Sequence, residues 1–299
     1  MFSSVTSVIM TPKLSKLQSF DTLVVMMHTS ETQTFETEDA CLAYRDEGAG
    51  PPLVLVHGGF LDHRMWDDQI PVFAQTHRVI AVDARGHGAS SNATRPFRHT
   101  DDLAALLRHL DVGPATLVGL SMGGGIAVDT ALEHPTLVRA LVVSGVGTSE
   151  PDFQDPWTKD TQSAYWQALG AGDIDAFVDA FSLLGTYGPR RTAEDTDAEV
   201  DRRVREMLRS TIAKHTGDEP DWSVPVTDTW ARAAKIEVPV LAVNGGIDSV
   251  DHIGMAERLV RTVPDGRATV VEGTAHYPNM ERPGAFNAIV RDFLRSGDL

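Results

Sequence analysis

The sequence has one cysteine and few basic residues, and each shortage excludes a class of protein. Cys41 is the single cysteine among 299 residues, which rules out an internal disulfide framework and fits a reducing compartment. Lysine and arginine number 26 against 42 aspartates and glutamates, so the formal net charge is -16. Nucleic acids and anionic membranes bind basic patches, and neither is therefore expected as a partner. We expect a cytoplasmic protein whose negative charge favours solubility.

Long apolar runs are also missing. No stretch of the sequence approaches the roughly 18 apolar residues of a membrane-spanning helix. The first 30 residues lack the charged start and continuous apolar stretch of a secretory signal. We interpret residues 1–30 as a poorly ordered extension, and Met26 or Met27 could be a natural start.

Short apolar runs alternate with helical patterns along most of the chain. The runs show no polar alternation, which is typical of strands buried on both faces. They cover residues 53–56, 79–82, 115–119, 140–144, 239–243 and 268–271. Helical patterns cover residues 65–75, 100–110 with Thr100 as the expected N-cap, 122–135, 252–264 and 283–294, and a hairpin pattern covers residues 32–48. The sequence therefore predicts an α/β fold, a mostly parallel sheet with helices on both faces.

One interval lacks a buried strand. Residues 147–232 contain only helical patterns, and we predict a helical cap or lid here, inserted after the sixth strand. The α/β core would then comprise residues 31–146 and 233–299. Ligands of such sheets bind at the carboxyl ends of the strands, which a lid could cover. Aromatic residues of the interval could line an apolar acyl pocket, although helix packing explains them equally well. They are Trp157, Trp166, Phe177, Phe181 and Tyr187.

Ser121 lies where an apolar run changes into a helical pattern. Gly119 and Gly123 flank it, which makes the GxSxG pattern of a nucleophile elbow. A plain glycine-rich turn would be the simpler interpretation, but a strand directly before and a helix directly after are the context that the elbow requires. A dinucleotide-binding turn is disfavoured because the GxGxxG spacing is absent.

A serine nucleophile requires a base and a group that orients the base. His276 follows the last predicted strand, near the edge of the sheet where Ser121 is expected. The acid is expected between serine and histidine in the chain, and two candidates follow the strand at residues 239–243. Asp248 is favoured because it comes just after a glycine turn. Asp251 is the alternative, with a simpler role as a charge at a helix start.

Acyl transfer also requires donors for an oxyanion. The helix that starts at Met122 directs its first N–H groups toward the serine, and we assign the Met122 amide as one donor. The turn after residues 53–56 supplies the second donor, Gly59, with Phe60 as its substitute. The alternative is that this segment is an ordinary turn. Neither an HExxH pattern nor a cysteine cluster is present, so no metal and no cofactor are expected.

The motifs together resemble the α/β-hydrolase superfamily over residues 40–298. The resemblance rests on "HGGFLDHRMWDDQIP", "VIAVDARGHGASS", "GLSMGGGIA", "GGID" and "GTAHYPNMERP". Within the superfamily the chain is similar to 3-oxoadipate enol-lactonases and related small-ester hydrolases. The resemblance implies that Asp83, Arg85 and His87 belong to a structural turn. Cofactor-free haloperoxidase-like and carbon–carbon bond hydrolases share most of these motifs.

The function that we predict is hydrolysis of a small carboxylic ester or lactone by a serine hydrolase. Ser121 would attack the carbonyl, His276 would transfer the proton and Asp248 would orient His276. Hydrolysis of a carbon–carbon bond in a ring-cleavage product, or a haloperoxidase-like reaction, is the alternative for an enzyme. A ligand sensor on the same fold is the alternative of another class. The sequence indicates no oligomeric state.

Overall fold

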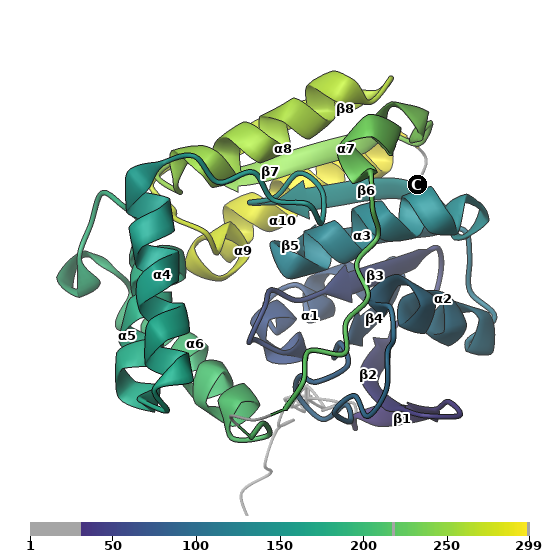
Figure 1. The fold of residues 1–299 in the computed structure, drawn as a ribbon. Helices are drawn as coiled ribbons and strands as arrows, with labels where there is room; N and C mark the ends of the chain where they lie inside the picture. Colours follow the sequence, from purple (N-terminus) through teal and green to yellow (C-terminus); the bar gives the residue numbers. More distant parts are fainter. Residues whose placement is uncertain (1–30, 217–218, 298–299) are drawn as a thin grey trace, which may run out of the picture.

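A computed structural model of the protein describes residues 31–216 and 219–297, so the extension predicted at residues 1–30 lies outside the described part. The strands form one eight-stranded sheet in the order β1-β2-β4-β3-β5-β6-β7-β8 (Figure 1). Their bounds are β1 Gln33–Glu36, β2 Cys41–Glu47, β3 Pro52–Val56, β4 Arg78–Val82, β5 Ala115–Leu120, β6 Val138–Ser144, β7 Val240–Gly245 and β8 Gly266–Val271. The hairpin β1–β2 is antiparallel and β2 pairs antiparallel with β4, whereas the other neighbours are parallel. The predicted fold class is confirmed.

The central strands are apolar because both faces of the sheet are covered. In β3, Leu53 and Leu55 belong to one hydrophobic cluster, and Val54 and Val56 belong to the cluster on the opposite face. The edge strand β8 differs from the expectation of burial on both faces, since only Val271 among its residues is fully buried. An edge strand has a neighbour on one side only, which leaves part of its surface to solvent.

Helices cover both faces of the sheet. On one face pack α2 His99–His109, α3 Met122–Glu133 and α8 Val250–Thr262. On the other face pack α1 Ile70–Phe73, α9 Pro278–Glu281 and α10 Pro283–Ser296. This arrangement places the carboxyl ends of β5, β6 and β7 at one edge of the sheet, because these three strands are parallel neighbours.

Two local expectations on the helices are wrong. Instead of one helix over residues 65–75, the chain forms a 3₁₀ turn, His63–Trp66, followed by the short α1. Pro71 lacks the N–H that a continuous helix would need at this position. Thr100 is not an N-cap, because α2 begins one residue earlier, after Arg98. The Thr100 hydroxyl instead donates a hydrogen bond to the Thr130 hydroxyl on α3.

The first helices after β6 lie to one side of the sheet (Figure 1). They are α4 Pro156–Gly170, α5 Ile174–Ser182, a π-helical turn Leu183–Tyr187, and α6 Ala198–Ile212, followed nearer β7 by α7 Thr229–Arg232. We call α4, α5 and α6 the cap helices. Residues 219–228 lead from α6 to α7 across the front of the molecule in Figure 1, and an isolated bridge pairs Ser223 with Phe97. Among the described residues, no helix has the length and apolar character needed to cross a membrane.

Candidate active site

Ser121 occupies a strained turn between β5 and α3. Its backbone has φ 53° and ψ -117°, a conformation that L-residues rarely adopt. The turn is tight enough to require glycine on both sides. A Cβ on Gly119 would lie 2.2 Å from the Gly123 carbonyl oxygen, and one on Gly123 would lie 2.1 Å from the Val56 carbonyl oxygen. The glycines of the sequence motif are therefore needed for the close approach of α3 to β5 and β3.

The elbow is anchored to the neighbouring strand. The Ser121 amide donates to the carbonyl of Ser144 at the end of β6 over 2.8 Å, and its own carbonyl accepts from the Gly125 amide over 3.0 Å. The side chain lies at the start of α3, where the positive end of the helix dipole favours negative charge. Ser121 is partly exposed and lines a cavity.

Asp248 and His276 form a buried hydrogen-bonded pair at the same edge of the sheet. Asp248 follows β7, His276 follows β8, and His276 Nδ1 lies 2.7 Å from Asp248 Oδ2. The imidazole lies over Gly145, where an added Cβ would be 2.4 Å from its Cε1 atom. Gly145 directly follows Ser144, the residue that anchors the elbow. No hydrogen bond joins the Ser121 hydroxyl to His276 within the described part of the chain.

The charges of this pair suit a base that is neutral near pH 7. Burial lowers the pKa of His276 and outweighs the opposite effect of the Asp248 carboxylate. Burial alone would raise the pKa of Asp248, but the adjacent imidazoles hold it below its usual range. A neutral imidazole beside an ionised carboxylate can accept a proton from a substrate or a nucleophile.

A second histidine, His252, shares the Asp248 carboxylate and was not predicted from the sequence. His252 Nδ1 lies 3.0 Å from Asp248 Oδ1, on the oxygen that His276 leaves free. The two imidazole rings have centroids 4.2 Å apart with an interplanar angle of 31°. His252 is buried and lines the cavity beside Ser121. The four-residue spacing from Asp248 to His252 in the first turn of α8 was the available signal in the sequence.

Asp251, the alternative acid, has a different set of partners. Its Oδ2 accepts hydrogen bonds from the backbone amides of Gln154 and Asp155, over 3.0 and 2.9 Å. It therefore joins the first turn of α8 to the segment that leads into α4. The structure brings Asp248, and not Asp251, within hydrogen-bonding distance of His276.

The amides assigned to an oxyanion hole come from two segments in contact. A Cβ on Gly59 would lie 3.8 Å from the Met122 Cβ. Phe60 has a positive φ of 59°, and the Leu61 amide closes the turn on the Gly58 carbonyl. In residues 31–216 and 219–297, no backbone carbonyl accepts a hydrogen bond from the amides of Gly59 or Phe60. The Met122 amide is the first of α3, which has no partner within its own helix.

The cavity beside Ser121 has a volume of about 250 Å³. It extends along α3, beneath the segment at residues 223–226 and beside the loop after β6. Its walls are Arg98, His99, Thr100, Ser121, Met122, Gly125, Ile126, Asp129, Gly145, Val146, Thr148, Ser149, Pro151, Phe153, Ser223, Val224, Pro225, Val226, His252 and Met255. None of the five aromatic residues expected in a pocket is among them.

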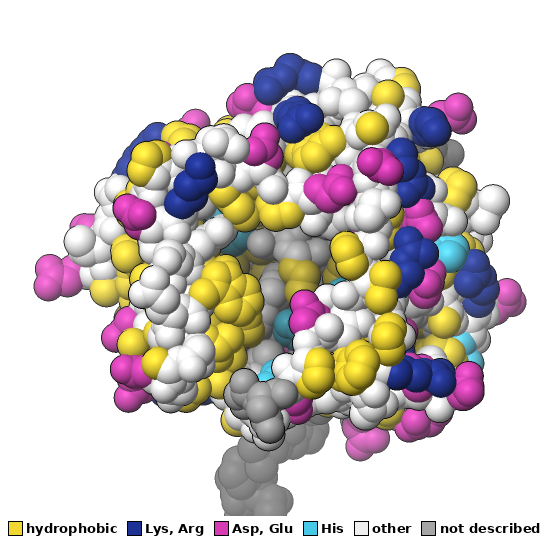
Figure 2. All heavy atoms as spheres, in the orientation of Figure 1, with side chains coloured by type: hydrophobic (Ala, Val, Ile, Leu, Met, Phe, Trp, Pro, Cys, Tyr) yellow, Lys and Arg dark blue, Asp and Glu magenta, His cyan; other side chains and the backbone are white. Residues whose placement is uncertain are grey.

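Three of those five aromatic residues pack around Phe60 instead. The Phe60 ring lies edge-on to Phe177, Phe181 and Trp166, with centroids 5.1, 5.3 and 5.9 Å away. Figure 2 shows a hollow in this face of the molecule, and hydrophobic side chains line its wall next to α4 and α6. Trp157 is partly buried and packs against the hydrophobic cluster that contains Leu53 and Phe177. The Tyr187 hydroxyl donates to Asp201 and accepts from Arg205. Contact of these five residues with a substrate stays a prediction.

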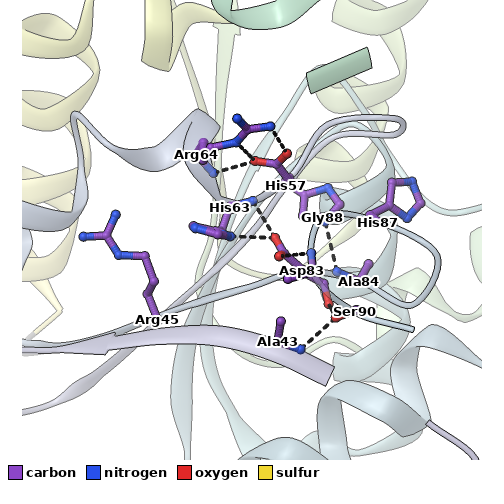
Figure 3. Close-up of polar contacts among 12 residues, drawn as sticks. Ala43, Arg45, His57, His63, Arg64, Asp83, Ala84, His87, Gly88 and Ser90 are labelled. Carbon is purple, nitrogen blue, oxygen red and sulfur yellow. Dashed lines mark hydrogen bonds and ion pairs between the residues drawn. The ribbon is translucent and has the colours of Figure 1, made fainter. Parts of the chain in front are cut away.

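The turn at Asp83 is held by a network of its own (Figure 3). Asp83 Oδ1 accepts from both the amide and the Nδ1 of His63, over 2.7 and 2.8 Å. Arg85 forms ion pairs with Asp39 and Asp102. These contacts join β2, β4 and α2 and support the expectation of a structural turn.

Within the described part of the chain, two groups of side chains lie close enough to bind a metal ion. One comprises Asp248, His252 and His276, and the other comprises Asp62, His63 and Asp83. In the first group, both carboxylate oxygens already pair with the imidazole Nδ1 atoms. In the second, His63 Nδ1 already pairs with Asp83. Neither group needs an ion to satisfy these atoms.

The chain matches known proteins over most of its length. The family model described as "alpha/beta hydrolase fold" matches residues 51–283. A pimeloyl-[acyl-carrier protein] methyl ester esterase of Neisseria meningitidis serogroup B is 30% identical over 81% of this chain and 92% of its own. The 3-oxoadipate enol-lactonase 2 of Acinetobacter baylyi is 26% identical over 90% of this chain and 98% of its own.

Solved structures agree with these matches. A hydrolase from Pseudomonas aeruginosa PA01 has a TM-score of 0.72 and 30% identity, over 89% of this chain and 99% of that one. The two relatives in sequence described above are an esterase and a lactonase by name. The protein therefore belongs to the α/β-hydrolase family.

Proposed function

We propose that the protein hydrolyses a small carboxylic ester or lactone through an acyl-enzyme intermediate. The observation that carries the proposal is the strained Ser121 at the sheet edge that also holds the buried His276–Asp248 pair. The esterase and lactonase among its relatives support the same class of reaction.

In the proposed reaction, the Ser121 hydroxyl attacks the ester carbonyl while His276 Nε2 takes its proton. Asp248 accepts a hydrogen bond from Nδ1–H, which orients the ring and stabilises its cation. The Met122 amide and the Gly59 amide, or that of Phe60, donate to the oxyanion. His276 then protonates the leaving alkoxide and later activates the water that releases the acid.

The first test is the substitution Ser121→Ala. We expect it to lower kcat by about 10⁴-fold or more, because removal of a triad member abolishes nucleophilic catalysis. The melting temperature should not fall, since the serine hydroxyl makes no hydrogen bond within the described residues. Wild-type protein should also be labelled at Ser121 by a fluorophosphonate. A loss of only a few fold would contradict the proposal, and cleavage of a vinylogous diketo acid in place of esters would favour a carbon–carbon bond hydrolase.

The acid is tested by comparing two aspartates three residues apart. Asp248→Asn should lower kcat by roughly 10³- to 10⁴-fold, because the amide no longer selects the correct imidazole tautomer. Asp251→Asn is the matched control. It should cost under about 1 kcal/mol of stability and little rate, since its partners are backbone amides of the segment before α4. Both kcat and thermal melts are measured, and an inactive Asp251→Asn variant would refute the assignment of Asp248.

A further inference from the structure

A buried carboxylate, Asp129, lines the cavity beside Ser121. Met122, Gly125, Ile126 and Asp129 are spaced to lie on one face of α3, and all four line the cavity. Asp129 is seven residues beyond Met122, a distance of about 10 Å along the helix axis. The side of α3 thus connects the proposed nucleophile to an acidic group at a defined distance.

Asp129 lacks the partner that a buried carboxylate normally requires. The residue is 6% exposed, and its one hydrogen bond is from the neutral hydroxyl of Ser149 to Oδ1, over 2.8 Å. Among the described residues, no lysine, arginine or histidine lies within ion-pair distance of it. Burial raises the pKa of Asp129 to about 7. A buried charge without a counter-ion costs stability, which indicates a function in binding.

The cations near Asp129 already pair with other acids. Arg98 lies 2.8 Å from Glu133 and 3.8 Å from Asp101. Arg232 also pairs with Glu133. Three carboxylates, those of Asp101, Asp129 and Glu133, therefore lie near two arginines.

Of the basic residues in the cavity wall, Arg98 pairs with Glu133 and His252 contacts Asp248, which leaves His99. His99 also lines the cavity, and burial lowers its pKa to about 4, so that it is uncharged near pH 7. The site favours a positively charged ligand.

Apolar side chains also line the cavity that Ser121 and Asp129 share. They are Ile126, Val146, Val224, Pro225, Val226 and Met255. A ligand that matches this cavity wall has an apolar chain with a polar group at each end. One end is the ester at Ser121, and the other end faces Asp129.

We propose that the cavity binds esters whose acyl chain ends in a positively charged amine, with the ammonium group at Asp129 and the carbonyl at Ser121. This inference rests on the proposed ester hydrolysis. A six-carbon acyl chain matches the length, because each bond of an extended zigzag chain advances about 1.2 Å, so that six bonds and one hydrogen bond of about 2.9 Å span about 10 Å.

The test compares four methyl esters of equal chain length. They are methyl 6-aminohexanoate, methyl 6-hydroxyhexanoate, methyl hexanoate and monomethyl adipate. We expect kcat/KM for the amine to exceed that for methyl hexanoate by about tenfold or more, since the ammonium makes a charge-assisted hydrogen bond. The carboxylate of monomethyl adipate should make it the poorest substrate. Equal or lower kcat/KM for the amine would overturn the proposal.

Two variants separate the charge of Asp129 from the shape of the cavity. Asp129→Asn keeps an acceptor for Ser149 but no charge, and the ratio of kcat/KM between the amine and the methyl-ended ester should fall to near one. Ser149→Ala, the matched control, keeps the carboxylate and should keep the preference. In wild-type protein, KM for the amine should decrease as the pH rises through about 7, where Asp129 ionises. An unchanged ratio in Asp129→Asn contradicts the inference.

A binding measurement makes the inference independent of turnover. Calorimetry should detect binding of methyl 6-aminohexanoate to the Ser121→Ala variant. The double variant Ser121→Ala/Asp129→Asn should bind the same ester at least tenfold more weakly. If wild-type protein hydrolyses no ester, the proposed function fails, and this titration still decides the role of Asp129. Equal affinity in both proteins would refute it.

Discussion

At the scale of single residues, the Asp248 carboxylate serves two imidazoles. His276 takes one oxygen and His252 takes the other, so the negative charge that supports His276 is shared. Asp248 and His276 are the charged or titratable groups that His252 contacts, and its other ring neighbour is the edge of Phe153. We expect His252 to be a positioning residue that moderates the basicity of His276.

The substitution His252→Phe tests this role. It preserves a ring beside His276 but removes the donor to Asp248, so that the full carboxylate charge acts on His276 and raises its pKa. The acid limb of the kcat/KM profile, where His276 becomes protonated, should therefore move to higher pH. Activity at the low end of the profile should decrease as a result.

His252→Asn is the control for this prediction. Its amide can donate to Asp248 from a similar position, so the acid limb should return toward that of the wild-type protein. A purely structural His252 would lower kcat at every pH and leave the position of the limb unchanged. That outcome, in both variants, would contradict the prediction.

At the scale of elements, the elbow depends on how closely α3 approaches the sheet. A Cβ on Gly123 would overlap the carbonyl oxygens of Val56 and His57, at 2.1 and 2.5 Å. Gly123→Ala should therefore displace α3 and cost about 1–3 kcal/mol of unfolding free energy. The amide of Met122 would move with the helix, so kcat should decrease as well. Urea unfolding and steady-state kinetics measure the two effects.

Gly254→Ala is the matched helix control. Gly254 lies within α8, and a Cβ there would meet no atom within 4 Å. Alanine is the better helix former, so this variant should gain roughly 0.5–1 kcal/mol and keep its activity. If both substitutions had the same effect, the close approach of α3 would not be the cause.

At the scale of the whole molecule, the cap helices share a hydrophobic cluster with the core. Phe177 and Met207 belong to the same buried cluster as Leu53, Trp66 and residues of α10. We therefore expect the cap helices and the sheet to unfold in one transition, with circular dichroism and tryptophan fluorescence coincident.

Phe177→Ala tests this coupling, and Trp166→Ala is its control. Phe177 is 0% exposed, whereas Trp166 on α4 is 53% exposed. Loss of the buried ring should lower the unfolding free energy by about 3–5 kcal/mol and keep a single transition. Loss of the exposed ring should cost much less. Two separated transitions in the Phe177→Ala variant would show that the cap helices unfold by themselves.

The fold class, the sequence of strands and helices along the chain and the position of the turn at Ser121 could be predicted from the amino-acid sequence. Strands buried on both faces must be apolar throughout, so residues 53–56 and 115–119 stand out without knowledge of their neighbours. The glycines around Ser121 are also a local signal, because the turn itself excludes a Cβ. The order of the motifs then placed Asp248 and His276 at the ends of adjacent strands.

Only the tertiary structure decided which side chains meet across the fold. Asp129 carries no local pattern that distinguishes it from other helix residues, and the short spacing from Asp248 to His252 does not show that His252 lies beside His276. His276 follows β8, and Ser149, the partner of Asp129, lies in the loop after β6, so both contacts join separate segments of the chain. The cavity likewise follows α3 and not the predicted aromatic residues, because those rings pack around Phe60. Burial and the lack of a counter-ion are properties of the packed molecule, and no short segment of sequence encodes them alone.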